Sequence, residues 1–264
     1  MPKLYGKIYL TIFLTTLSIL SWTTFSLAVA LETDKEYIDI YPNQYENNSV
    51  SSIAWVLGTT VVLYQNDQEI KSFFQKNQSR TGNNISDFVE GFGDNNKLFP
   101  SLGLLYLYGK VRDNEKTQHL AVLSLESVLL STLITNTIKF STHRSRPYTG
   151  ESFDSWGEPS FDNDNDYLSF PSGHATSAFS VATIIASEYK EKPFVKILSY
   201  SIASLTAISR VYDNKHWASD IFLGSVIGYY SGKTVIRLNE QNNNISIIPA
   251  LREQGYGLAI KYRF

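Results

Sequence analysis

The sequence predicts an all-α protein, an up-and-down helical bundle with its functional site at one end, followed by a short C-terminal β-hairpin or strand tail. Three observations lead to this prediction. Four long stretches are dominated by apolar residues, so most of the surface of each helix should be buried. The connection between the second and third stretches is short, which makes those helices antiparallel neighbours. The last residues alternate between apolar and polar, as in a half-buried strand.

The N-terminus, residues 1–30, has the features of a secretory signal peptide. Two lysines precede an apolar run from Ile8 to Leu27, and Ala28-Val29-Ala30 supplies a small-residue cleavage site. An uncleaved membrane anchor is the alternative, because about 20 apolar residues can span a bilayer. Residues 31–50 are polar and without periodicity, which indicates a linker. We therefore expect export, to the periplasm or to the extracytoplasmic side of a membrane.

The predicted helical domain covers residues 51–238. It opens with helical patterns over Ser51–Tyr64 and Glu69–Gln78, and a break at Thr81–Asn84, rich in glycine and asparagine, follows. A second such break spans Gly91–Asn96. The four helices expected to build the bundle are about Thr117–Ile138, Ser172–Tyr189, Phe194–Ile208 and Ala218–Leu238.

Helix directions should bring three sequence blocks to one end of this bundle. If the first bundle helix runs upward, the block Lys139–Pro147 follows at its top. The second helix then starts at the top from the block Pro171–His174 and descends. The third helix climbs back, so that the block Ser209–Asp220 also lies at the top. This convergence needs only that the four helices pack up and down.

The tail, residues 239–264, differs from the rest of the chain. Gly257–Phe264 alternates strictly between apolar and polar positions, and the apolar stretch Ile245–Leu251 precedes it. The pattern predicts a β-hairpin. Such a hairpin could pack on the helical domain, or it could serve as an association or targeting signal.

Three cations of the blocks, Lys139, Arg146 and Arg210, are candidates for binding phosphate. A phosphoryl group in transfer carries negative charge on its equatorial oxygens, which guanidinium, ammonium and backbone N–H groups can stabilise. Arginine binds phosphate through two parallel hydrogen bonds, whereas lysine acts as a point charge. His143 and Arg144, in the same basic stretch, are instead predicted to lie on a solvated basic face or a membrane-surface patch.

His216 and Asp220 are four residues apart, so on a helix they share a face. The carboxylate can then hold one imidazole nitrogen and leave the other with its lone pair directed into the site. An imidazole held in this way is a nucleophile or a base, and we predict that His216 is the nucleophile. Taken alone, the same pair could be a capping or packing contact.

Ser172, Gly173 and His174 stand where the second bundle helix begins. The free N–H groups of a helix start form an anion site, and glycine lets an oxygen approach the backbone closely. Ser172 can also serve as the N-cap, which is compatible with that role. His174 is the candidate general acid, because its ordinary pKa of about 6.5 lies near operating pH.

Together, the three blocks resemble the type 2 phosphatidic acid phosphatase superfamily, which includes acid phosphatases, membrane lipid phosphatases and vanadium haloperoxidases. Its pattern, K-x6-RP, PSGH and SR-x5-H-x3-D, is met at every position between Lys139 and Asp220. The resemblance implies a helical bundle, a phosphohistidine intermediate on His216, and His174 as acid and then base. The phosphate-binding residues that it implies are Lys139, Arg146, Ser172, Gly173 and Arg210.

No metal or cofactor is expected at this site, and vanadate is expected to inhibit. The loop Asp162–Asp166 has the alternating acids of a calcium-binding loop. Its sixth position is Tyr167 instead of glycine and its twelfth is Gly173 instead of glutamate, so it is interpreted as a solvated loop.

A metal-independent phosphomonoesterase acting outside the cytoplasm is the function predicted from the sequence. The main alternative is an integral membrane phosphatase for lipid phosphates or pyrophosphates. A vanadium-dependent haloperoxidase and a non-catalytic phosphate binder are minor alternatives. The net charge of −2 argues against nucleic acid as a partner. The substrate, a small-molecule or lipid phosphate ester, and the oligomeric state are left open.

Membrane association is possible, but the sequence favours a soluble or peripherally attached bundle. The stretch Thr117–Ile138 is long enough to span a bilayer but carries Glu126 near its middle, and Phe194–Ile208 is short. A charge at the bilayer centre costs about 2.5–3.5 kcal/mol on insertion scales.

Overall fold

Helices account for most of the structure. The computed structural model describes residues 45–241, 245–252 and 255–262, with side chains described for residues 52–240. The predicted signal peptide and residues 31–44 of the predicted linker lie outside the described residues. The α-helices are α2 (Tyr45–Lys76), α3 (Arg80–Glu90), α4 (Asn95–Val111), α5 (Glu115–Thr142), α6 (Gly173–Glu188), α7 (Pro193–Tyr212) and α8 (Ala218–Gln241). Short 3-10 turns, η1 (Pro147–Thr149) and η2 (Asn165–Tyr167), lie in the loop before α6.

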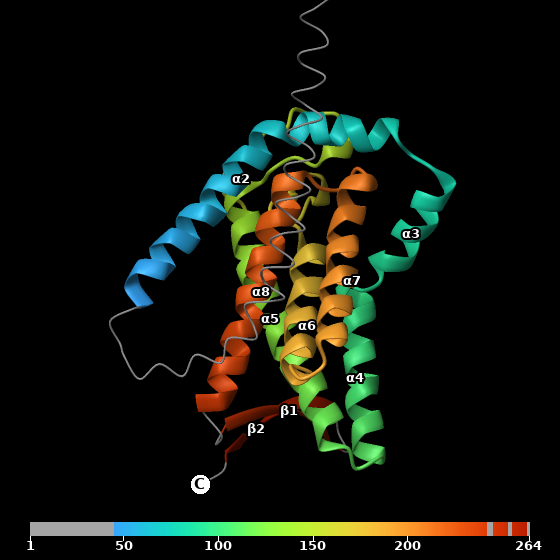
Figure 1. Ribbon diagram of the computed structural model, residues 1–264, viewed down its shortest axis with the longest axis vertical. Coiled ribbons are helices and arrows are strands. Elements are labelled where there is room, and N and C mark those ends of the chain that lie inside the picture. The colour runs from blue at the N-terminus through green and yellow to red at the C-terminus, as the bar shows by residue number, and fades with distance from the viewer. Residues whose placement is uncertain (1–44, 242–244, 253–254, 263–264) are drawn as a thin grey trace, which may run out of the picture.

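Helix α6 is the central helix of the bundle and packs against α5, α7 and α8 (Figure 1). The Ser172 side chain caps its start by accepting a hydrogen bond from the Ala175 N–H at 3.5 Å. Small buried residues line α6, and α8 approaches them very closely. A Cβ atom on Gly228 of α8 would stand 2.2 Å from the Thr176 carbonyl oxygen. Glycine is therefore required for α8 to lie this close to α6.

Chain directions agree with the predicted up-and-down arrangement. Helices α5 and α7 run toward the end of the bundle that α2 crosses, and α6 and α8 begin at that end (Figure 1). The loops that carry the three sequence blocks therefore gather at this one end of the bundle.

Helices α5 and α7 extend beyond the predicted range at both ends. Helix α5 continues to Thr142, where His143 adopts a left-handed φ of 39° and ends it. Helix α7 continues to Tyr212, so Arg210 lies in its last turn. By length and composition, α5 with 28 residues and α7 with 20 residues could each cross a membrane. The expectation that the third bundle helix is too short for a span is thus wrong.

Helix α2 joins two predicted helices into one and crosses the end of the bundle where the blocks meet (Figure 1). It begins at Tyr45, within the stretch predicted as a linker. Leu63, Asp67 and Ile70 are buried at helical spacing, so one face of α2 packs on the bundle. The polar sequence at 65–68 looked like an interruption because an aspartate occupies an inward position.

Helix α3 passes through the break predicted at residues 81–84. Its N-cap, Ser79, accepts a hydrogen bond from the Gly82 N–H at 3.0 Å. The Tyr212 hydroxyl, from the end of α7, donates to Asn83 Oδ1 at 2.7 Å. A cap and a contact with a distant helix thus hold a stretch that has weak helix propensity.

The C-terminal strands β1 (Ile245–Arg252) and β2 (Gly255–Tyr262) pair antiparallel, with Ile245 opposite Tyr262. They lie at the end of the bundle opposite the three blocks (Figure 1). The role of this tail stays a prediction.

Candidate active site

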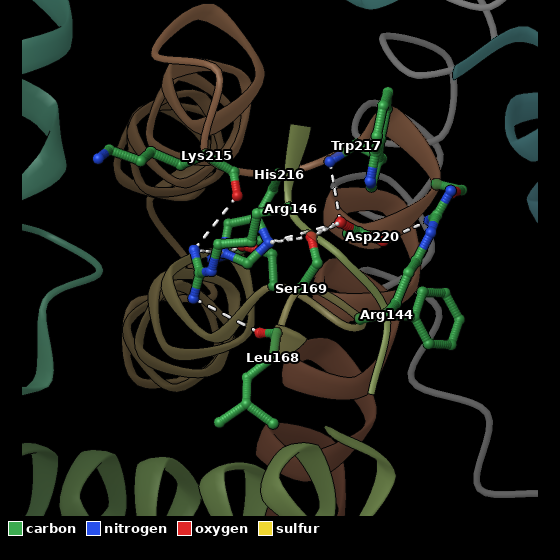
Figure 2. A network of polar contacts seen from close by, with 12 residues as sticks. Arg144, Arg146, Leu168, Ser169, Lys215, His216, Trp217 and Asp220 are labelled. Carbon is green, nitrogen blue, oxygen red and sulfur yellow. Dashed lines mark hydrogen bonds and ion pairs between the residues drawn. The ribbon is translucent and has the colours of Figure 1, made fainter. Parts of the chain in front are cut away.

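His216 lies in the turn before α8, and Asp220 lies in the first turn of that helix. The prediction that both stand on one helix is wrong, because His216 lies two residues before α8 begins, yet the two side chains still meet. His216 Nδ1 is 3.5 Å from Asp220 Oδ2, and the backbone N–H of Trp217 donates to the same oxygen at 2.8 Å (Figure 2). The carboxylate therefore caps the start of α8 and faces the imidazole at once.

The two nitrogens of His216 face different partners. Arg146 Nη1 lies 3.2 Å from Nε2 (Figure 2). Arginine can only donate hydrogen bonds, so Nε2 accepts and carries the lone pair. The proton of a neutral His216 is consequently on Nδ1, facing Asp220. The site holds the tautomer that a nucleophile at Nε2 requires.

Electrostatics favour a neutral imidazole next to an ionised carboxylate. Burial, together with the charges of Arg146 and Lys139, lowers the pKa of His216 well below its usual value, although Asp220 opposes this. Burial alone would raise the pKa of Asp220, but Arg144 and the His216 hydrogen bond lower it below the usual range. At neutral pH the pair is a carboxylate and a free base.

Arg144 is fully buried, so its predicted place on a solvated basic face is wrong. Its Nη1 donates to Asp220 Oδ1 at 2.6 Å, and its Nη2 donates to Asp67 Oδ2 at 2.8 Å. Ring faces of Tyr64, Trp156 and others surround the guanidinium. His143 is buried as well. Arg144 looked like a surface residue in the sequence because its acidic partners, Asp67 and Asp220, lie far along the chain.

Lys139 and Arg146 both reach the carbonyl oxygens of the loop before α6. The Lys139 ammonium donates to the Leu168 carbonyl oxygen and lies 3.5 Å from the Ser169 carbonyl oxygen. Arg146 donates to the Asn165 carbonyl at 2.7 Å and, through Nη2, to the Leu168 carbonyl at 3.4 Å. The two cations thus converge on one loop beside His216, where a phosphate could replace carbonyl oxygens as their partner.

His174 and Arg210 form the other side of the site, with Glu90 of α3 between them. Glu90 Oε1 is 3.1 Å from Arg210 Nη1 and 3.9 Å from His174 Nε2. Burial lowers the pKa of His174 to about 4, and the charges of Arg210 and Arg146 add to this effect, whereas Glu90 and Asp94 oppose it. Both guanidinium groups therefore act on this imidazole.

Ser172 and Gly173 are at the start of α6 as predicted. The Ser172 side chain is occupied as the N-cap, and its backbone N–H donates to the Asp220 carbonyl at 3.0 Å. A Cβ atom on Gly173 would have no neighbour within 4 Å, so the backbone there is open. The geometry brings the predicted site residues to one end of the bundle, and their roles stay predictions.

Several residues of this site were missed by sequence reasoning. Ser169 Oγ donates to Asp220 Oδ2 at 2.6 Å and lies 3.4 Å from His216 Nδ1. Asp67 and Ser219 contact Arg144. Ser169 lies only two residues before the PSGH block, and Ser219 directly precedes Asp220, so their positions offered a local signal. Asp67 offered a weaker one, an acidic residue at an inward helical position.

Aromatic residues of the loop before α6 anchor it to α2. Tyr64 of α2 packs against Phe153 and Trp156, at ring centroid distances of 5.2 and 5.9 Å. Trp156 Nε1 also donates to the Tyr64 hydroxyl at 3.1 Å. These two loop residues are anchors, whereas Phe161 is almost fully exposed.

Comparison with protein families gives a match to the PAP2 superfamily over residues 120–244. Lipid A 1-phosphatase of Porphyromonas gingivalis is 42% identical over 66 residues, which are 25% of this chain and 15% of that protein. The probable diacylglycerol pyrophosphate phosphatase 1 of Schizosaccharomyces pombe is 26% identical over 195 residues, 60% of this chain and 69% of that protein.

A PA-phosphatase related-family protein of Dictyostelium discoideum is 29% identical over 153 residues, 53% of this chain and 56% of that protein. The chain thus spans 15% and 56% of the length of two of these relatives. Among solved structures, Aquifex aeolicus LpxE aligns with a TM-score of 0.52 at 22% identity, over 65% of this chain and 94% of that one. This likeness concerns the fold.

Proposed function

This chain carries a PAP2 superfamily domain, and we propose that it is a metal-independent phosphatase that hydrolyses lipid phosphate esters at a membrane. One observation carries the proposal. His216 presents Nε2 to Arg146 while Asp220 lies behind Nδ1. A base fixed in this tautomer beside a phosphate-binding cation is arranged for attack on phosphorus.

In the first step, His216 Nε2 attacks phosphorus and the bond from phosphorus to the alcohol oxygen breaks. His174 gives its proton to that oxygen, so a neutral alcohol leaves. Asp220 stabilises the positive charge that forms on the His216 ring. Negative charge on the equatorial oxygens is stabilised by Lys139 and Arg146, together with Arg210, the Ser172 hydroxyl and the N–H group of Gly173.

In the second step, a water molecule replaces His216 on phosphorus. His174, now neutral, takes a proton from this water, so the nitrogen–phosphorus bond breaks as the new oxygen–phosphorus bond forms. Inorganic phosphate leaves, and both imidazoles return to their starting states. No metal takes part in either step. Vanadate should occupy the same cations and inhibit.

Lipid phosphates are favoured over soluble esters by two observations. Two of the related proteins are named as a lipid A phosphatase and a diacylglycerol pyrophosphate phosphatase. The outer surface of the bundle also exposes large apolar side chains on several helices, which is typical of contact with lipid or a partner. Examples are Ile53, Leu57, Leu104, Val111, Leu129, Leu133, Phe194 and Ile197.

The proposed location is the extracytoplasmic side of a membrane. Helices α5 and α7 are long and apolar enough to cross one. The export signal predicted for residues 1–30 agrees with that location, and mass spectrometry of the mature N-terminus would test whether cleavage follows Ala30.

A substrate panel on purified protein tests the proposed function. Phosphatidate, diacylglycerol pyrophosphate, a sugar phosphate and an aryl phosphate are assayed in detergent with excess chelator. We expect turnover of the lipid substrates without metal, inhibition by vanadate, and loss of activity in His216→Ala. Unchanged turnover in His216→Ala, or turnover that requires a divalent cation, would contradict the proposal.

A further inference from the structure

Asp67 of α2 is a buried carboxylate that lies outside the three sequence blocks and outside residues 120–244. Its side chain is 1% exposed and faces the end of the bundle where the site lies. An ionisable group without water around it needs partners for its charge. The partners of Asp67 connect it to Asp220 through hydrogen bonds.

Three hydrogen bonds fix the Asp67 carboxylate. Arg144 Nη2 donates to Oδ2 at 2.8 Å, and the Ser219 hydroxyl donates to the same oxygen at 2.5 Å. The Ser219 backbone N–H donates to Oδ1 at 2.9 Å. Ser219 is the residue before Asp220, so Asp67 holds the chain next to the dyad as well as the guanidinium.

Arg144 has one available orientation. Its Nη1 donates to Asp220 Oδ1 at 2.6 Å and to the Ser219 hydroxyl at 2.8 Å, while Nε and Nη2 donate to the Phe153 carbonyl at 3.0 and 2.7 Å. All three guanidinium nitrogens are therefore engaged. With Oδ1 of Asp220 bound to Arg144, Oδ2 is the oxygen that faces His216 (Figure 2).

Two carboxylates and one guanidinium, all buried, are a weak source of stability. Removing them from water costs several kcal/mol per ion, and apolar residues of similar volume often serve stability equally well. This network joins α2 and Arg144 to the first turn of α8, next to the candidate nucleophile. Its presence there requires an explanation other than stability.

We propose that Asp67 is a positioning residue for His216, acting through Arg144 and Asp220. It fixes the guanidinium, the guanidinium fixes one oxygen of Asp220, and the other oxygen is left aligned with His216 Nδ1. The inference rests on the proposed function and extends its machinery to α2. Helix α2 then contributes a residue to the site in addition to crossing the end of the bundle where the site lies.

Substitution of Asp67 by asparagine tests this directly, because the amide keeps the shape and removes the charge. The readout is kcat and KM for phosphatidate in detergent, with the full-length protein. We expect kcat to fall about 10- to 100-fold, by analogy with the groups that orient metal-binding histidines, with KM unchanged. Glu69→Gln, an exposed position on the same helix, is the matched control and should keep wild-type kcat.

A double substitution separates positioning from general loss of structure. Asp220→Asn should lower kcat on the order of 10⁴-fold, by analogy with the aspartate of a serine protease triad. If Asp67 acts through Asp220, Asp67→Asn adds no further loss in that background. If the double variant loses kcat by the product of the two single losses, or if Asp67→Asn keeps wild-type kcat, the inference is overturned.

If Asp67→Asn fails to fold, Ser219→Ala replaces it, because that change removes the hydrogen bonds that the Ser219 hydroxyl makes with Asp67 and Arg144 and leaves all three charges. It should lower kcat with KM unchanged, and wild-type kcat there would also overturn the inference. The proposed function is judged separately by His216→Ala. If His216→Ala is inactive while Asp67→Asn is fully active, the positioning role of Asp67 is rejected and the proposed function stands.

Discussion

At the scale of single residues, the environment of His174 determines how activity should depend on pH. A general acid must carry its proton when the substrate binds, yet burial and two arginines lower the pKa of this imidazole to about 4. Glu90, whose Oε1 is 3.9 Å from His174 Nε2, opposes that shift, as does Asp94. Glu90 therefore helps to keep His174, the proposed general acid, protonated.

Replacing Glu90 with glutamine should move the alkaline limb of the kcat/KM profile to lower pH. The change removes a negative charge beside His174 and leaves Arg210 without that partner, and both effects lower the pKa of His174 further. The measurement is the pH profile on phosphatidate. Asp87→Asn, an exposed position on the same helix, serves as control and should leave the limb in place. An upward shift in Glu90→Gln would contradict this role.

Asp67 should also give the stability of the protein a pH dependence. Burial raises its pKa to about 6 against the opposing charge of Arg144, whereas in the unfolded chain it titrates near 3.9. The folded state binds the proton more tightly, so this contribution is fully present below pH ~3.9 and is lost as pH rises through about 6.

Melting temperature measured from pH 4 to 7 tests that dependence. Wild type should lose more stability than Asp67→Asn as pH rises across this range, because the variant lacks the titrating carboxyl. Asp220 has the opposite sign, since its pKa is lowered: its contribution is lost only as pH falls below about 3.9. Parallel curves for wild type and Asp67→Asn would show that Asp67 is not the group responsible.

At the scale of elements, the close contact between α6 and α8 places the site. The dyad lies at the start of α8 and the proposed anion-binding site at the start of α6, so their separation depends on how near the two helices lie. A Cβ atom on Gly224 would clash with the Ser172 carbonyl oxygen, just as a Cβ atom on Gly228 would clash with the Thr176 carbonyl oxygen. Backbone atoms form these contacts, and they cannot move aside as a flexible side chain can.

Gly228→Ala should therefore destabilise the protein by about 1–3 kcal/mol, the usual cost of overpacking. Thermal unfolding in detergent measures it. Gly103→Ala on α4 is the control, since a Cβ atom there meets nothing within 4 Å. That control should be neutral or slightly stabilising, because alanine favours helix. Equal melting temperatures for the two variants would refute the packing argument.

Helix directions could be predicted from the sequence because they depend on apolar pattern and loop length, which are local properties. The meeting of Lys139, Ser172 and His216 at one end followed from them. The burial of Arg144 could not be predicted, since its partner Asp67 lies 77 positions away along the chain. The sequence predicted two helices in place of α2 for the same reason. A buried aspartate looks like a polar interruption of a helix until its partner is known.

At the scale of the whole molecule, many exposed apolar side chains lie along α4, α5 and α7, whereas the candidate site lies at one end of the bundle (Figure 1). Helix α5 is about 42 Å long at 1.5 Å per residue, more than the roughly 30 Å of a bilayer core. Its C-terminal turn carries Lys139 at the end where the blocks meet. This separation suits an enzyme that acts on a phosphate at the surface of the layer holding its acyl chains.

Charged substitutions on the apolar surface should weaken lipid association without harming the chemistry. Leu104→Glu and Leu133→Glu place a carboxylate on exposed apolar positions of α4 and α5. We expect less protein to float with phospholipid vesicles, while kcat on a soluble aryl phosphate in detergent is retained. Gln68→Glu, exposed on α2, is the control and should float like wild type. Unchanged flotation of both leucine variants would contradict membrane contact through this surface.

Arg146 occupies the lone pair of His216 when no substrate is bound. In the proposed mechanism a phosphate ester would draw that guanidinium to its own oxygens, so that binding of the anion would also free the proposed nucleophile. A neutral electrophile has no charge for Arg146 to bind, so the guanidinium would stay at His216 Nε2 and block the imidazole. The reactivity proposed for His216 would thus depend on the charge of the compound that binds, a form of selectivity that precedes recognition of the alcohol group.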